Sequence, residues 1–188
     1  MDLNLKITDM AGARPEHSTV IVNFVAAVRK QLLNSTCHVF SNNIQYRFQT
    51  DEGEYKTIIP DASINCRIKS RRGSSFIDAP RFVMEVLSES TEKYDRGEKM
   101  ELYRQQEVDE YWLVDWQKKK VEIYNLDYNE KGEPQFYWGN TITEDNKEEL
   151  KIIHFPNLKL LLMNYLLKWT WNIDKTKRLW KLSGCKSP

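Results

Sequence analysis

The chain has 188 residues, of which 40% are hydrophobic and 29% charged, and its formal net charge is +1. This length suits one domain with at most a small appendage, and the composition is that of a globular rather than a disordered protein. The near-zero net charge means that the chain as a whole is not strongly steered toward a polyanion.

The three cysteines, Cys37, Cys66 and Cys185, form no CxxC pair. Their odd number and wide spacing argue against a disulfide framework and a structural zinc site, so we expect free thiols in a reducing cytosol. The N-terminus has no apolar run of signal-peptide length, and the most apolar stretch, 158–167, is too short to span a bilayer. We therefore expect a cytoplasmic protein without membrane contact.

In chain order, alternating residues predict a short strand over 3–7, and apolar residues at helical spacing predict a helix over 16–33. Strand-forming residues predict strands over 39–48 and 57–68, separated by a polar turn at 51–54. A basic loop that contains glycine and serine covers residues 67–75.

The run RFVMEVL over 81–87 is apolar enough for a central strand buried on both faces, except for its one acid. A helix is predicted over 95–106, followed by strands over 110–115 and 120–126 that pair as a hairpin. Residues 126–151 are polar and acidic and predict loops with a marginal hairpin around 136–138, whereas 152–167 predict an apolar core element. This order predicts an α/β (α+β) fold with a mixed central sheet flanked by helices.

Two acids and a lysine stand out as candidate catalytic residues. Glu85 is the acid inside the apolar strand, and Asp61 follows Pro60 at the start of a strand. Acids from neighbouring strands can converge on one divalent cation, Mg²⁺ or Mn²⁺, with water and substrate phosphate filling the other positions. Lys99 lies four residues after Asp95 on one helix face, where it would orient the attacking water or neutralise charge on a phosphate.

Each of these residues also has an ordinary structural interpretation. A Pro–Asp pair at a strand start commonly forms a turn or cap, and Glu85 would face solvent if its strand lay at a sheet edge. Lys99 and Asp95 would form a surface ion pair worth little. Spacing alone is therefore a weak signal, and only the combination strengthens it.

Three motifs in order carry a resemblance to a known family: PDASINC at 60–66, APRFVMEVLSEST at 79–91 and KYDRGEKMELYRQQEVDEYWLVD at 93–115. Together they resemble the Uma-type family of restriction endonuclease-like proteins in the PD-(D/E)XK nuclease superfamily. MAGARPEHSTVIVNF at 10–24 and FPNLKLLLMNYL at 155–166 are similar to other parts of that family. The resemblance implies a restriction-endonuclease-like domain over residues 1–167, followed by a basic, tryptophan-containing tail over 168–188.

The resemblance also implies roles for individual residues. Asp61 would match the PD aspartate and Glu85 the acid of the (D/E)XK element, with the backbone carbonyl of Val86 as a further metal ligand. Leu87 stands where the usual lysine would be, so the lysine role would pass to Lys99.

Further residues match family positions: His17, Tyr94, Asp95, Tyr103, Glu110 and Asp115. Three of them are expected to support the site. Asp95 would position Lys99. His17 has no assigned role and would otherwise cap or pack at the start of its helix, and Glu110 would otherwise serve structure.

Two basic regions are candidates for nucleic-acid contact. Arg67, Lys69, Arg71 and Arg72 lie in the loop that leaves the Asp61 strand, which predicts positive charge near the metal, either for phosphate binding or as a solvated loop. In the tail, basic residues interleave with tryptophans; this pattern suits base stacking, but we favour packing on the domain because exposed tryptophans are unfavourable.

The predicted function is a divalent-metal-dependent endonuclease that hydrolyses DNA phosphodiester bonds, with Mg²⁺ or Mn²⁺ as cofactor. A homodimer is expected because dimers are common for this fold class. Two alternatives stay open: a catalytically silent nuclease-fold protein that acts as a DNA-binding or assembly module, and a nuclease that acts on RNA or on transposition intermediates.

Overall fold

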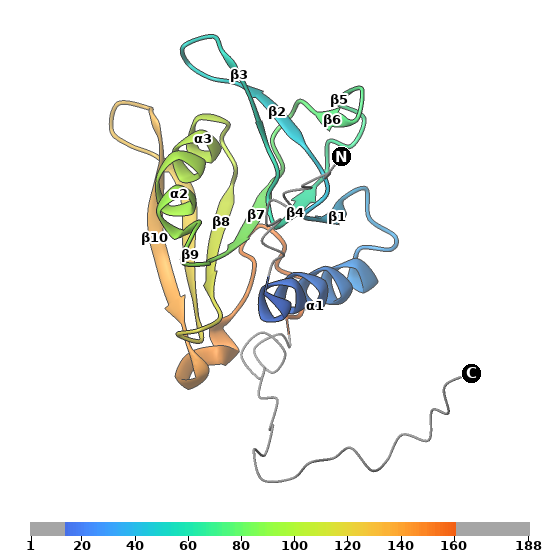
Figure 1. The fold of residues 1–188 in the computed structure, drawn as a ribbon, viewed down its shortest axis with the longest axis vertical. Coiled ribbons are helices and arrows are strands. Elements are labelled where there is room, and N and C mark those ends of the chain that lie inside the picture. Colours follow the sequence, from blue (N-terminus) through green and yellow to red (C-terminus); the bar gives the residue numbers. More distant parts are fainter. Residues whose placement is uncertain (1–13, 161–188) are drawn as a thin grey trace, which may run out of the picture.

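A computed structural model describes residues 14–160, which form a mixed α+β domain (Figure 1). Its larger sheet has six strands in the order β1 (His38–Ser41), β4 (Ala62–Asn65), β7 (Phe82–Val86), β8 (Glu110–Asp115), β9 (Lys120–Tyr128) and β10 (Pro134–Ile142). The β7–β8 pair is parallel and the other neighbouring pairs are antiparallel. The predicted mixed sheet flanked by helices is confirmed.

A smaller sheet has the order β3 (Tyr55–Ile58), β2 (Tyr46–Gln49), β6 (Ser75–Phe76) and β5 (Arg71–Arg72). The prediction of single strands over 39–48 and 57–68 is therefore wrong, because each region contributes one strand to each sheet. The first breaks at a turn in which the Asn43 N–H donates to the Ser41 carbonyl at 2.8 Å. The second breaks at Pro60, which has no N–H for a strand ladder.

Three helical segments are relevant to the site. Helix α1 (Pro15–Gln31) agrees with the prediction over 16–33. The predicted helix over 95–106 begins earlier and has three parts: α2 (Glu92–Tyr94), the π-helical turn η1 (Asp95–Lys99) and α3 (Met100–Gln105). Single π-helical turns are frequent at functional sites.

The two faces of the large sheet bury separate apolar cores. On one face α1 packs Val20, Phe24 and Val28 against the sheet, and the Phe24 and Phe82 rings stack with centroids 5.3 Å apart. On the other face lie α3 and the small sheet. Figure 1 shows α1 well apart from α2 and α3.

Strand β7 supplies side chains to both cores in alternation, as a strand buried on both faces should. Phe82, Met84 and Val86 belong to the α1 core, whereas Val83 belongs to the α3 core. By the same alternation, Glu85 lies on the α3 face, where its side chain is almost fully buried.

The predicted marginal hairpin around 136–138 is wrong, because these residues lie inside the nine-residue strand β10, of which eight residues pair with β9. A β-bulge lies between Trp138 and Asn140, at Gly139. A Cβ atom at this glycine would lie 2.4 Å from Asn125 Nδ2, so a larger residue would displace that side chain. After β10, a capped 3₁₀ segment, η2 (Glu144–Glu149), leads into residues 150–160. These contribute Ile152, Leu158 and Leu160 to the α1 core without forming a helix or strand.

The expectation of free thiols is wrong for two of the cysteines. Cys37 and Cys66 form a disulfide, directly beyond the cross-strand pair His38–Asn65 of β1 and β4. Spacing in the sequence does not reveal that these two residues meet, because the pairing depends on the register of two strands.

Several predictions fall outside the described residues: the strand over 3–7, Cys185, the tail over 168–188, the domain boundary at 167 and the rest of the 152–167 element. Within residues 14–160, no helix is long and apolar enough to cross a membrane.

Candidate active site

Asp61 and Glu85 meet across two adjacent antiparallel strands, since Asp61 directly precedes β4 and Glu85 lies in β7. The backbone N–H of Asp61 donates to Glu85 Oε2 at 3.2 Å. In the other direction, the backbone N–H of Val86 donates to Asp61 Oδ2 at 2.8 Å. Each carboxylate is thus held by the backbone of the segment that carries the other.

Glu85 has two further partners from the helical segment after β7. The Tyr103 hydroxyl donates to Glu85 Oε1 at 2.8 Å, and the Lys99 ammonium lies 2.9 Å from Glu85 Oε2. Lys99 also contacts Asp95 Oδ1 at 2.8 Å. The Tyr111 hydroxyl donates to the backbone carbonyl of Asp95 at 2.8 Å, which fixes the start of the π-helical turn. The structure therefore brings Asp61, Glu85, Asp95 and Lys99 together.

The electrostatics of this cluster favour a cation. Burial raises the pKa of Glu85 to about 8, although the neighbouring Lys99 ammonium acts to lower it. Burial alone would lower the pKa of Lys99, but Glu85 and Asp95 outweigh it and raise that pKa. Because burial favours the protonated form of Glu85, this group would release its proton on binding a divalent cation, which would then compensate the buried carboxylate.

His17, in the first turns of α1, reaches the same place from the opposite face of the sheet. Its Nε2 lies 3.2 Å from Asp61 Oδ2. The hydrogen bond with Asp61 raises the pKa of the imidazole, against the opposing effect of burial, and the backbone of Val86 adds to the increase. His17 therefore orients the Asp61 carboxylate.

A cavity of about 480 Å³ opens onto the cluster. Asp61, Asp95, Lys99 and His17 line it, and Glu85 lies directly behind them. The remaining wall consists of polar loop residues and one tryptophan: Arg14, Asn42, Ser88, Glu89, Ser90, Thr91, Trp116 and Gln117. The site is thus open to a substrate on one side and closed by the sheet on the other.

The residues present fit Mg²⁺ or Mn²⁺, although they would fill only part of the cation's coordination shell. Within residues 14–160, no three side chains of His, Cys, Asp or Glu form a group that would hold a metal by themselves. The candidate ligands are all hard oxygen donors: the carboxylates of Asp61 and Glu85 and the backbone carbonyl of Val86. This donor set suits Mg²⁺, which keeps several waters and completes its shell with substrate phosphate.

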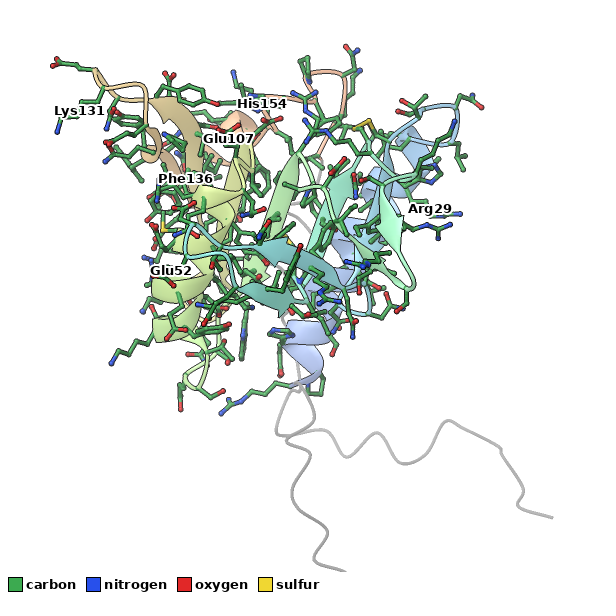
Figure 2. The ribbon with its side chains drawn as sticks, turned by 90° about the horizontal axis from the view of Figure 1, so that it is seen from above. Arg29, Glu52, Glu107, Lys131, Phe136 and His154 are labelled. Carbon is green, nitrogen blue, oxygen red and sulfur yellow. A yellow bond between two sulfur atoms is a disulfide. The ribbon has the colours of Figure 1, made fainter. Side chains whose placement is uncertain are left out.

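The structure does not bring Glu110 to this cluster. Its buried carboxylate accepts hydrogen bonds from Trp112 Nε1 at 2.7 Å and from the backbone N–H of Ile153 at 2.8 Å. Figure 2 shows His154, the next residue, on the opposite side of the molecule from the first turn of α1, where His17 lies. Glu110 thus fastens the segment after β10 to the sheet.

The basic loop also lies elsewhere, so the expectation that it would stand near the metal is wrong. Arg67, Lys69, Arg71 and Arg72 are exposed, and none of them lines the cavity. The loop follows Asn65, at the opposite end of β4 from Asp61. A role of these residues in nucleic-acid contact stays a prediction.

Tyr103 matches a family position, but the sequence assigned it no role in the site. Its hydroxyl binds Glu85, and it is fully buried. The signal was present in the spacing, because residues 95, 99 and 103 recur every four positions and so share one helix face.

Comparisons with known proteins agree with this fold. The chain belongs to the Uma2 family, described as "Putative restriction endonuclease", whose model matches residues 4–160. The uncharacterized protein slr1290 of Synechocystis sp. is 29% identical over 121 residues, which are 64% of this chain and 62% of that protein. The crystal structure of "a putative nuclease belonging to DUF820" from Anabaena variabilis has a TM-score of 0.63 at 16% identity, covering 83% of this chain and 82% of the other.

Proposed function

We propose that this chain is a divalent-metal-dependent endonuclease of the PD-(D/E)XK type that hydrolyses DNA phosphodiester bonds. The observation that carries the proposal is the convergence of Asp61, Glu85 and Lys99 beside one open cavity, with Asp95 holding the lysine. A protein that only bound DNA would have no use for buried carboxylates at a phosphate-facing site. Membership of a family of putative restriction endonucleases agrees with this function.

Asp61, Glu85 and the backbone carbonyl of Val86 would hold the cation. A bound Mg²⁺ or Mn²⁺ supplies Lewis-acid polarisation of the phosphodiester and compensates its developing charge. The Lys99 ammonium neutralises charge on the non-bridging oxygens or orients the attacking water. Asp95 and Tyr103 keep Lys99 and Glu85 in place, and His17 fixes the orientation of Asp61.

The test is cleavage of supercoiled and linear duplex DNA by the full chain, with Mg²⁺, with Mn²⁺ and with EDTA. Cleavage is expected only with metal, and Glu85→Ala and Lys99→Ala should abolish it in proteins that stay folded. Glu101→Ala is the matched control, since Glu101 is an exposed acid that pairs only with neighbours on α3. Unchanged cleavage in both site variants would refute the proposal. Salt-sensitive DNA binding without cleavage would instead support the catalytically silent DNA-binding protein.

We also propose that the basic loop contacts the phosphate backbone and that the chain acts as a homodimer. The exposure of Arg67, Lys69, Arg71 and Arg72 supports the first point. The second would pair two sites, one for each strand of a duplex, and so allow a concerted double-strand break. Sedimentation of the full chain with and without a DNA duplex tests the dimer.

A further inference from the structure

The inference concerns a row of three residues that lie in register across the large sheet. Glu85 of β7 pairs with Leu113 of β8, and Leu113 pairs with Glu122 of β9. Residues paired directly across neighbouring strands project from the same face. Glu85 and Glu122 therefore stand on one face of the sheet, on either side of Leu113. We refer to these three residues as the carboxylate row.

The π-helical turn η1 lies over the carboxylate row and contacts it at both ends. Lys99, the last residue of the turn, binds Glu85 at 2.9 Å. Arg96, near its start, binds Glu122 through both guanidinium branches, with Nη1 2.6 Å from Oε2 and Nη2 3.0 Å from Oε1. The Arg96 Nε also donates to Glu92 at 2.9 Å, which joins α2 to the same carboxylate.

This second ion pair is better fixed than an ordinary surface pair. Paired guanidinium–carboxylate hydrogen bonds fix direction as well as distance. Glu122 is buried, and the Tyr124 hydroxyl donates to its Oε2 at 3.1 Å. The hydrogen bond from Arg96 lowers the pKa of Glu122 to about 2, so the carboxylate stays charged in neutral solution.

We propose that Arg96 and Glu122 are positioning residues that set where the π-helical turn presents Lys99 and Asp95 to the reacting phosphate. Neither residue touches the cavity, so they act through the turn. The turn contacts the carboxylate row through these two side chains, and without Arg96 the start of the turn keeps its hydrogen bond from the Tyr111 hydroxyl but loses its link to Glu122. Misplacing a catalytic group by about 1 Å can cost up to roughly 100-fold in rate. This proposal rests on the proposed endonuclease function.

The experiment compares the wild type with Arg96→Met and Arg96→Lys by two readouts. The first is kcat and KM for DNA cleavage with saturating metal. The second is the NMR signal of the Lys99 ammonium, assigned by its absence in Lys99→Arg, which reports the position of this group whether or not the protein cleaves DNA. Lys120→Met is the matched control, because Lys120 contacts the same Glu122 carboxylate at 2.6 Å from β9 rather than from the turn.

Arg96→Met is expected to lower kcat by roughly 10- to 100-fold with KM nearly unchanged, and to shift or broaden the Lys99 signal. Arg96→Lys should recover part of both, and Lys120→Met should change neither. Unchanged kcat and an unchanged Lys99 signal in folded Arg96→Met would overturn the proposal, even if that variant were less stable. Should Arg96→Met not fold, Glu122→Gln is judged by the same criteria. If the wild type cleaves no DNA, the endonuclease proposal fails, while the Lys99 signal still decides the positioning claim.

Discussion

Asp61 and Glu85 are cross-linked through two backbone N–H groups, one on each strand: the Asp61 N–H binds the Glu85 carboxylate, and the Val86 N–H binds the Asp61 carboxylate. This reciprocal arrangement ties the position of each acid to the strand of the other. Their separation is therefore set by the β4–β7 pairing, which is a property of the sheet and not of flexible loops.

The first prediction concerns the charge on Glu85. Glu85→Gln keeps the size and an acceptor for the Tyr103 hydroxyl but removes one metal-binding charge, so DNA cleavage should fall by roughly 100- to 1,000-fold. Mn²⁺ affinity, measured by calorimetry, should fall with it. Retained Mn²⁺ affinity in this variant would mean that Glu85 is not a metal ligand.

The second prediction concerns the stability that Lys99 provides. Its ammonium is the counter-charge for two carboxylates that are almost fully buried, Glu85 and Asp95. Removing one partner of a buried ion pair costs about 3 to 5 kcal/mol, so Lys99→Met should lower the free energy of unfolding in urea by that amount. Lys118→Met is the control, because Lys118 is 64% exposed beside Asp115 and should contribute below about 1 kcal/mol. Equal losses in the two variants would contradict this account.

The third prediction concerns pH and Glu110. Burial raises its pKa from 4.5 to about 7, so the folded state holds the proton more tightly than the unfolded state does. The resulting stabilisation is fully present below pH 4.5 and is lost as the pH rises through about 7, with a total of about 3 kcal/mol. The stability difference between the wild type and Glu110→Gln, from urea unfolding at several pH values, should shrink over this window. A difference that stays constant from pH 4.5 to 8 would show that Glu110 does not titrate there.

The fourth prediction concerns the disulfide between Cys37 and Cys66, which are 29 residues apart in sequence. Closing a loop of this length restricts the unfolded chain and stabilises the fold by about 3.6 kcal/mol. Reduction should therefore lower the melting temperature of the wild type and leave a Cys37→Ser, Cys66→Ser variant unaffected. Cys185→Ser serves as the control and should respond to reductant as the wild type does.

The fifth prediction concerns the basic loop. The logarithm of the DNA-binding constant falls with the logarithm of the salt concentration, and each lost phosphate contact makes this slope less steep by about 0.9. Arg71→Ala with Arg72→Ala should therefore flatten the salt dependence of DNA binding, without changing the cleavage rate at saturating DNA. An unaltered salt slope would remove these two arginines from the DNA-binding surface.

The sequence predicted the elements whose pattern is local. Helix α1 and strands β7, β8 and β9 lie within a few residues of their predicted positions, because apolar periodicity alone defines them. The family motifs identified Asp61, Glu85, Asp95 and Lys99 in advance, and the structure brings these four together. The spacing of the residues alone did not establish this arrangement.

What the sequence did not reveal depends on contacts between distant segments. Each of two predicted strands is divided between the two sheets. The breaks are short, and in the sequence they look like ordinary polar or proline positions. The Cys37–Cys66 pairing requires the β1–β4 register. Glu122 resembles any charged residue of an alternating strand until the turn that carries Arg96 is placed above it.

The bulge at Gly139 has a consequence for solubility. Among the described residues, β10 has no strand on its outer side, and a long open edge of this kind invites other chains to add to it. The bulge divides the edge into one run of five paired residues and another of three, with Pro134 at the start of the longer run. An incoming strand would meet an interrupted hydrogen-bond pattern, so we expect the bulge to disfavour aggregation through this edge of the sheet.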